Sequence, residues 1–141
     1  MQVLPHLGSG GLVSGAIEVA KAVINSGGIS IVVTSGGYRK NELDRIGSKV
    51  EILPVESKNI FAMKSNVKKI ISIINKYDVS LMHVRSRAPA WSCLWVSKRV
   101  NIPLVTTFHG TYGTENIFKK IYNKVMISGD KTIAISEFIA E

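Results

Sequence analysis

The sequence has little cysteine, few acidic residues and no long apolar run. Cys93 is the single cysteine, which excludes an internal disulfide framework and suits a reducing compartment. No apolar stretch approaches the roughly 20 residues that cross a bilayer. The N-terminus, MQVLPHLGSGG, lacks the basic segment and apolar core of a secretory signal. We therefore expect a cytoplasmic protein, and its 141 residues fit one domain, residues 1–141.

The acidic deficit leaves 18 Lys and Arg against 10 Asp and Glu, a net charge of +8. Residues 58–76 contain five lysines and no acid, and residues 85–124 contain seven bases and a single acid. Such a distribution favours an anionic partner, either a phosphorylated small molecule or an acidic membrane surface. A solubilising basic surface explains it equally well. Nucleic acid is disfavoured because no recognised reading element is present.

Short apolar runs alternate with helical patterns along the chain. We expect strands at residues 1–5, 30–34, 50–53, 80–84, 104–108 and 131–135. Helical patterns occupy residues 13–25, 41–46, 64–76, 89–100 and 116–126. Strands that are apolar throughout and separated by helices predict a mostly parallel sheet covered on both faces. The fold class is therefore α/β, a Rossmann-like, doubly wound sheet of about six strands.

Ligands of such sheets bind outside the carboxyl ends of the strands, and those ends carry the candidate site residues. Gly10 and Gly11 follow the first strand, Arg85 and Arg87 the fourth, and His109 the fifth. Glycines let backbone N–H groups approach an anion, and arginine forks suit phosphate or carboxylate. A histidine at a strand end can act as a general base or donate to a sugar. Structural roles for each residue remain open at this point.

Several other kinds of site are disfavoured. The loop lacks the third glycine of a dinucleotide fingerprint, where Val13 stands, so an oxidoreductase with Arg39 beside a cofactor phosphate is the weakest alternative. Three histidines and one cysteine, none closely spaced, predict no metal site. The basic helix at 64–76 could lie on anionic lipid, although packing its isoleucines on the sheet is commoner. Trp91 and Trp95 share a helix face and are more typical of a core or an interface than of a base-stacking platform.

Four segments together resemble the N-terminal domain of glycosyltransferase family 4, the retaining enzymes of the GT-B fold. They are LPHLGSGGLVSGAIEVAKAV, HVRSRAPAWS, PLVTTFHGTYG and TIAISEFIAE. RSRAPAW and TFHGTY look most like the bacterial branch that builds lipopolysaccharide core and other cell-envelope glycans. The resemblance implies a nucleotide sugar as co-substrate and a glycolipid or glycan acceptor. It implies no further cofactor and no metal.

The resemblance also implies roles for the candidate residues. Gly10 and Gly11 match the family's glycine loop, near the donor phosphates and the acceptor. His109 matches a histidine that contacts the transferred sugar and is the candidate catalytic residue. Arg85 and Arg87 match a basic segment that meets the acceptor or a phosphate.

Two departures from the family pattern concern the acceptor and the second domain. Many relatives have a Glu shortly after the glycines (GGxE), whereas here Gly11 is followed by Leu12, Val13 and Ser14. The acceptor contact that this Glu makes in relatives is therefore not carried over. Ser136 matches the junction with a C-terminal donor domain, which would begin near the end of this sequence. We therefore expect an acceptor-side domain that binds acceptor, catalyses poorly alone, and works with a separate C-terminal domain or subunit. The alternative is a non-catalytic binding module, and a peripheral contact with the inner face of the membrane fits either hypothesis.

Overall fold

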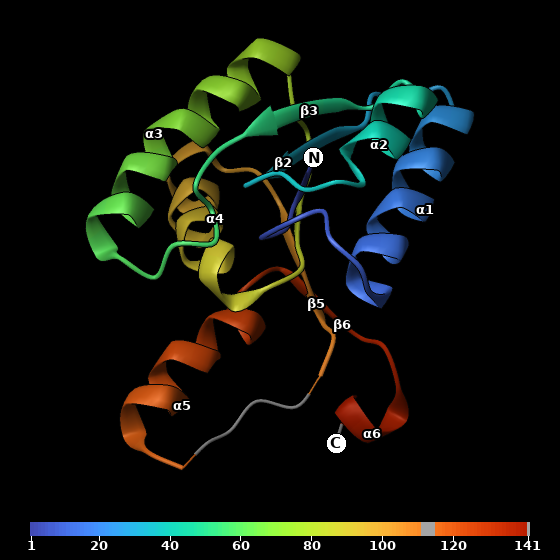
Figure 1. Cartoon of the computed structure of the whole chain (residues 1–141). Coiled ribbons are helices and arrows are strands. Elements are labelled where there is room, and N and C mark those ends of the chain that lie inside the picture. Colours follow the sequence, from blue (N-terminus) through green and yellow to red (C-terminus); the bar gives the residue numbers. More distant parts are fainter. Residues whose placement is uncertain (111–114, 141) are drawn as a thin grey trace.

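The strands of this chain form one six-stranded sheet with helices on both faces (Figure 1). The structure, a computed structural model, describes residues 1–110 and 115–140. The strands are β1 (Gln2–Val3), β2 (Ile31–Thr34), β3 (Lys49–Ile52), β4 (Met82–Val84), β5 (Leu104–Phe108) and β6 (Lys131–Ala134). Each overlaps a run that the sequence predicts as a strand, because short runs rich in β-branched residues suit a sheet buried on both faces.

The sheet is parallel throughout and has the order β3-β2-β1-β4-β5-β6. From β1 the chain winds outward to β3, returns to the other side of β1 at β4, and winds outward again to β6. The predicted doubly wound α/β fold is therefore confirmed. The winding direction reverses between β1 and β4, and the carboxyl ends of these two strands flank the place where open α/β sheets bind ligands.

The helices cover the two faces of the sheet and bury two separate hydrophobic clusters (Figure 1). On one face lie α1 (Gly11–Asn25) and α2 (Lys40–Ile46), and on the other α3 (Ile60–Tyr77), α4 (Arg87–Val100) and the 3-10 turn η1 (Lys124–Ile127). Two shorter helices follow the last strands, α5 (Ile117–Asn123) after β5 and α6 (Glu137–Ala140) after β6. Trp91 and Trp95 are half-buried and pack against the hydrophobic cluster on the α3 and α4 side of the sheet, with ring centroids 6.2 Å apart, which agrees with the predicted core or interface position.

Helix α3 separates its apolar and basic residues by helical spacing. Its inward face is buried and consists of Met63, Asn66, Val67, Ile70, Ile73 and Ile74. The lysines of the helix are exposed. Asn59 caps the helix, because its side-chain oxygen accepts hydrogen bonds from the amides of Phe61 and Ala62. The interpretation in which the isoleucines pack on the sheet and the lysines face solvent is confirmed.

Helix α4 begins two residues earlier than the sequence predicts. The predicted helix starts at residue 89, whereas the helix in the structure begins at Arg87 after an extended Ser86 with φ −158°. Pro89 fits because its missing N–H falls in the first turn, where no intrahelical partner exists. Arg87 is therefore part of a helix rather than of the extended segment after β4, and this changes the direction of its side chain relative to Arg85.

The core of the α3 face predicts a specific loss of stability. Ile70 is 0% exposed and belongs to the cluster between α3 and the sheet. Ile70→Ala should lower the free energy of unfolding by about 2–5 kcal/mol, because it removes buried methylene and methyl groups and leaves a cavity. Urea unfolding followed by circular dichroism measures this change. Lys69→Ala, one residue away on the exposed face, should stay within about 0.5 kcal/mol of the parent, and an equal effect of the two changes would contradict this assignment of faces.

Candidate functional site

The loop after β1 ends in two glycines that begin helix α1. Gly10 has φ 116° and ψ 167°, a backbone conformation that strains any residue with a Cβ. Gly11 is the first helical residue, and neither its φ nor its surroundings require glycine, because a Cβ there would meet no atom within 4 Å. Both residues are exposed. The N-terminal amides of α1 are thus left uncovered, an arrangement that suits an approaching anion.

Arg85 directly follows β4 and is 5% exposed. Its Nε donates to Oε1 of Gln2 at 2.9 Å, and the amide nitrogen of Gln2 donates to the carbonyl of Ala16 at 2.9 Å. A Cβ on Gly15 would lie 3.5 Å from Nη1 of Arg85, so the guanidinium lies against the second turn of α1. None of the ion pairs formed by residues 1–110 and 115–140 involves Arg85. A buried cation is therefore held in place by neutral groups.

His109 follows β5 and faces this guanidinium. Its Nε2 is 3.5 Å from Nη1 of Arg85. Burial and the charge of Arg85 lower the pKa of His109, so the imidazole is neutral near pH 7. Since an arginine only donates hydrogen bonds, a neutral His109 that accepts at Nε2 carries its proton on Nδ1. The structure thus brings together two of the predicted site residues that are far apart in sequence.

A second histidine lies beside this pair within the sheet. Nε2 of His83, in β4, is 2.5 Å from Oγ1 of Thr107 in β5. Burial, together with the charge of Arg85, lowers the pKa of His83 to about 4. His83 and His109 are therefore both neutral near pH 7, and the positive charge at this edge of the sheet is concentrated on Arg85.

Arg87 has different neighbours from Arg85. Its Nη1 donates to Oδ1 of Asn123 at 2.6 Å, and the guanidinium carbon lies 5.6 Å from the centroid of the Tyr122 ring. Because α4 begins at Arg87, this side chain turns toward α5, whereas Arg85 packs against α1. The two arginines that the sequence predicts as one basic segment therefore belong to two separate places.

Two further candidates lie at some distance from the Arg85–His109 pair in the chain. Ser136 directly precedes α6, and its carbonyl accepts hydrogen bonds from the amides of Ile139 and Ala140 at 3.1 Å. Its role at a domain junction stays a prediction. Arg39, considered for a cofactor phosphate, is bonded through Nε to Glu42 at 2.7 Å and through Nη1 to Ser14 at 2.9 Å.

The family of the chain follows from its match to a family model. The model for Glycosyltransferase Family 4 matches residues 9–141. The chain belongs to this family. The crystal structure of a glycosyltransferase from Rickettsia africae ESF-5 is similar at 40% identity and a TM-score of 0.82. That alignment covers 99% of this chain and 38% of the Rickettsia chain, so the family 4 domain described above corresponds to well under half of that relative.

A more remote structure shares the fold of this family 4 domain. UDP-GlcNAc 2-epimerase from Neisseria meningitidis, bound to UDP-GlcNAc, superposes with a TM-score of 0.54 at 14% identity. The alignment covers 95% of this chain and 40% of the epimerase. A search of curated proteins gives no match. The match to the family model and the similarity to the Rickettsia structure confirm the resemblance to glycosyltransferase family 4 that the sequence motifs predict.

Sequence reasoning missed some residues that contact or lie near the predicted site residues of this family 4 domain. Gln2 orients Arg85. The sequence feature that could have indicated this role is a polar residue in an otherwise apolar first strand. Lys58 and Tyr122 lie near Arg87 without any motif that marks them. Within the described residues, no group of three His, Cys, Asp or Glu side chains is placed to hold a metal ion.

The low pKa of His83 predicts how stability depends on pH. An unfolded histidine titrates near 6.5, so the unfolded chain takes up this proton before the folded chain does as the pH falls. The contribution of His83 is complete above about pH 6.5 and is lost progressively toward pH 4. His83→Gln keeps a polar partner for Thr107 and removes the titration, so its free energy of unfolding should decline less steeply with acidification.

Urea unfolding at pH values of about 7, 5.5 and 4.5 tests this expectation. His6→Gln changes an exposed histidine and should reproduce the slope of the parent. If His83→Gln also reproduces that slope, His83 does not contribute to the pH dependence.

Proposed function

We propose that this chain is the N-terminal, acceptor-side domain of a retaining glycosyltransferase. The complete enzyme moves a hexosyl unit from a nucleotide sugar to a glycolipid or polysaccharide acceptor of the lipopolysaccharide type. The observation that carries this proposal is the buried guanidinium of Arg85, which has no carboxylate partner in the described part of the chain and lies 3.5 Å from His109. Family membership supports the reaction class, and the RSRAPAW and TFHGTY segments support the cell-envelope branch.

Arg85 suits the main electrostatic demand of such a transfer. The bond between the anomeric carbon and the diphosphate breaks, a bond to the acceptor oxygen forms, and the proton of the acceptor hydroxyl passes to the departing diphosphate. Negative charge grows on the departing diphosphate, and a cation that is already oriented stabilises that charge without reorganisation. Gln2 holds the guanidinium of Arg85 at 2.9 Å before any substrate binds. We place Arg85 toward a phosphate of the donor or an anionic group of the acceptor.

His109 suits a contact with the transferred sugar. A neutral imidazole with its proton on Nδ1 can donate a hydrogen bond to a sugar hydroxyl, while Nε2 faces Arg85. Its lowered pKa keeps it in this form near neutral pH. In the proposed reaction His109 is the catalytic residue that orients the transferred hexosyl unit.

The glycine loop suits a phosphate at the start of α1. The backbone at Gly10 requires glycine, but nothing in the packing of this domain requires it at Gly11. The space that a side chain would fill at Gly11 is open, and the uncovered amides of a helix N-terminus bind anions. We assign this space to the donor phosphates or to the reacting end of the acceptor.

The proposed enzyme needs a second domain. The chain corresponds to 38% of the Rickettsia glycosyltransferase, and GT-B enzymes place most of the nucleotide-sugar site in their C-terminal domain. A C-terminal donor domain or subunit that meets this domain near Ser136 is therefore the proposed partner. The nucleotide sugar is a co-substrate, and the proposal includes no metal. The domain alone should bind acceptor and catalyse poorly.

The role of His109 predicts a loss of turnover. In a complete enzyme that contains this domain, His109→Ala should lower kcat at least tenfold or so, because it removes a hydrogen bond to the reacting sugar. The fold should be retained, as judged by circular dichroism and urea unfolding. Release of the nucleoside diphosphate in the presence of acceptor measures kcat. Asn75→Ala, at an exposed position near the end of α3 and away from the strand ends of the site, is the control, and an unchanged kcat for His109→Ala would rule out this role.

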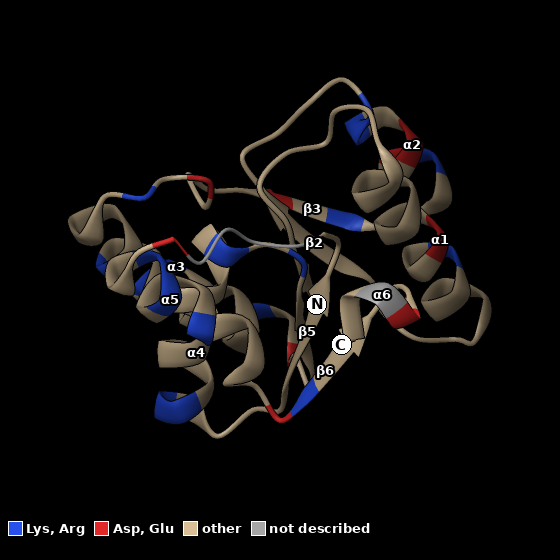
Figure 2. Ribbon diagram, turned by 90° about the horizontal axis from the view of Figure 1, so that it is seen from below, with Lys and Arg blue, Asp and Glu red and all other residues tan. Residues whose placement is uncertain are grey.

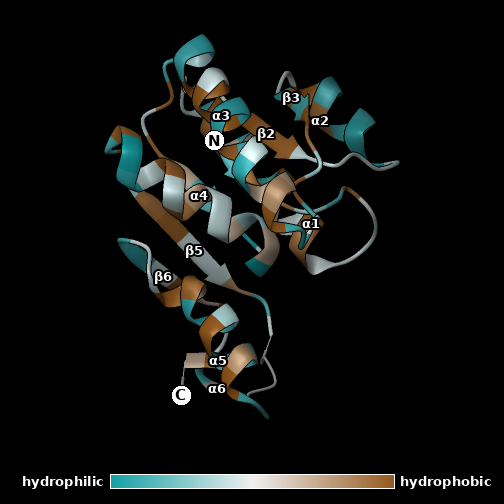
Figure 3. Ribbon diagram, turned by 90° about the vertical axis from the view of Figure 1, so that its left-hand side faces the viewer, coloured by the Kyte–Doolittle hydropathy of each residue, from teal (hydrophilic) through white to brown (hydrophobic). Residues whose placement is uncertain are grey.

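A contact with an anionic membrane surface fits one side of the domain. Basic residues gather on the side formed by α3, α4 and α5 (Figure 2). Apolar residues of α5 are interspersed with its lysines (Figure 3). We define the basic-apolar rim as the exposed residues Lys58, Ile60, Phe61, Lys64, Ile117, Phe118, Lys119, Lys120 and Ile121. Phe61 is 79% and Phe118 80% exposed.

Exposed aromatic side chains among lysines are typical of proteins that lie on anionic lipid. No helix of the described residues has the length and apolar character needed to cross a bilayer. We therefore propose a cytoplasmic enzyme that contacts the inner face of the cytoplasmic membrane through the basic-apolar rim.

This contact predicts a change in vesicle binding. Phe118→Ser should weaken binding to vesicles that contain phosphatidylglycerol by about threefold or more, since a partly inserted phenyl ring is lost. Co-sedimentation measures the bound fraction. Ile29→Ser changes a residue that is 65% exposed, precedes β2 and lies outside the basic-apolar rim, so it should leave binding unchanged. Equal binding by Phe118→Ser and the parent would exclude the rim as the membrane contact.

A further inference from the structure

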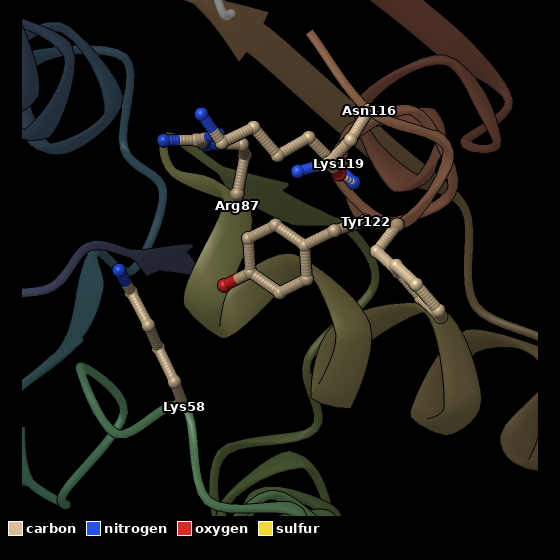
Figure 4. Close-up of a pocket in the computed structure, with 6 residues that line it drawn as sticks. Lys58, Arg87, Asn116, Lys119 and Tyr122 are labelled. Atoms are coloured by element: carbon tan, nitrogen blue, oxygen red, sulfur yellow. Dashed lines mark hydrogen bonds between the residues drawn. The ribbon is translucent and has the colours of Figure 1, made fainter. Parts of the chain in front are cut away.

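A pocket of about 620 Å³ lies between the start of α3, the start of α4 and helix α5 (Figure 4). The residues that line it are Lys58, Arg87, Asn116, Phe118, Lys119 and Tyr122. They come from three segments that are distant in sequence. In Figure 4 Lys58 lies on one side of the Tyr122 ring, and Arg87 and Lys119 lie on the other. The pocket is separate from the Arg85–His109 pair, although Arg87 follows Arg85 by only two residues.

The lining contains three cations and no acid. Lys58 forms no ion pair with any residue that the structure describes. Lys119 pairs with Glu115 at 2.8 Å, but both side chains are at least half exposed, and such pairs contribute little free energy. Arg87 is oriented by Asn123 and by the ring of Tyr122. The lining residues therefore supply three positive charges and no negative one, and Arg87 is the cation with a defined orientation.

The hydroxyl of Tyr122 adds a second indication of a ligand. This oxygen is buried and has no hydrogen-bond partner among the residues that the structure describes. An unpaired buried hydroxyl lowers the stability of a folded protein by about 1–3 kcal/mol. A ligand atom that accepts a hydrogen bond from this hydroxyl would remove that cost. Asn116 adds an amide on the same wall, although its side-chain oxygen is already bonded to the amide of Lys119 at 2.8 Å. Phosphate oxygens can pair with the cations of the pocket, and sugar hydroxyls can form hydrogen bonds with Tyr122 and Asn116.

A second basic hollow, between α3 and α4, serves as a comparison. Its lining includes Lys64, Lys68, Arg99 and Trp95. It has as many cations as the first pocket, but none of its polar side-chain atoms is buried without a partner. The two pockets therefore do not differ in the number of cations. They differ in that the first contains an oriented arginine, Arg87, and the buried hydroxyl of Tyr122.

We propose that the pocket formed by Lys58, Arg87, Lys119 and Tyr122 binds a phosphorylated sugar. This proposal rests on the proposed function and names the class of acceptor, a saccharide with a phosphate group. The phosphate would bind in this pocket, separate from the reacting centre at Arg85 and His109. Phe118 lines the pocket and also belongs to the basic-apolar rim. A lipid-linked acceptor can thus place its phosphate in the pocket while its chain stays in the membrane.

Titration of the ¹⁵N-labelled chain with glucose 6-phosphate tests the pocket. The amide signals of Asn116, Lys119 and Tyr122 should shift, and unphosphorylated glucose should not shift them. Lys58→Gln should weaken binding roughly threefold to tenfold, since one charge-assisted contact is lost. Lys68→Gln removes the same charge from the second hollow and is the matched control, with binding unchanged. Equal weakening by both changes, or equal binding of glucose, would overturn the proposal.

A second arm identifies the source of the phosphate. Phosphatidylcholine vesicles with and without phosphatidic acid are compared for the parent, Lys58→Gln and Lys64→Gln, because Lys64 belongs to the basic-apolar rim but does not line the pocket. If Lys58→Gln weakens vesicle binding more than Lys64→Gln does, the lipid phosphate enters the pocket. If both changes weaken vesicle binding equally, the vesicles report the rim alone, and glucose 6-phosphate is the relevant phosphate source. If neither source depends on Lys58, the proposal is wrong.

The proposed function and the proposed phosphate pocket can be contradicted independently of each other. His109→Ala should leave glucose 6-phosphate binding unchanged, because His109 does not line the pocket. Loss of transfer without loss of this binding therefore tests the catalytic role alone. Absence of this binding with normal transfer overturns the pocket and leaves the proposed function standing.

Discussion

The hydrogen bond between the guanidinium of Arg85 and the amide oxygen of Gln2 connects the parts of the sheet that wind in opposite directions. Gln2 lies in β1, and Arg85 follows β4, the neighbouring strand across the reversal. The same amide group donates to Ala16 in α1, and the same guanidinium faces His109 after β5. One buried contact thus fixes the relative positions of two strand ends, a helix and a catalytic candidate.

The contact is an expensive way to build a core. Burying a cation costs several kcal/mol, and apolar residues of similar size often stabilise a fold more than a buried charge does. Here the cost is not offset by a carboxylate in the described part of the chain, and burial lowers the pKa of Arg85 accordingly. A neutral amide orients the charge and leaves its attraction for an anion largely intact. This is the arrangement expected where a protein stabilises negative charge during a reaction.

Much of the sheet could be predicted from the sequence, because its strands are short runs rich in apolar and β-branched residues and the helices between them are periodic. The contact between Arg85 and His109 could be expected from that topology, since the carboxyl ends of parallel strands share one edge. The separation of Arg87 from Arg85 could not be predicted in this way. Pro89 is a helix-start signal, and local sequence does not show whether a helix begins at the proline or two residues before it.

Contacts between distant segments were beyond sequence reasoning for a similar reason. Gln2 and Arg85 are 83 positions apart, and a polar residue in a short strand does not indicate its partner. The pocket beside Arg87 depends on where α5 packs. Helix α5 has no buried residue, so hydrophobic periodicity carries no information about that position. Its place is set by side-chain contacts such as Arg87 with Asn123 and Trp91 with Tyr122, whose ring centroids are 6.4 Å apart.

The net charge of +8 is divided between places with different physical characters. On α3 the lysines are solvated, and four of the five ion pairs in the described residues are formed by lysines with exposed ammonium groups. Such charges are screened by salt and draw anions only loosely toward a surface. Arg85 is buried and Arg87 is held by Asn123, so each acts on an anion at a defined position. Under the proposed function, the solvated lysines would raise the local concentration of an anionic substrate, whereas Arg85 and Arg87 would each bind a phosphate at a defined place.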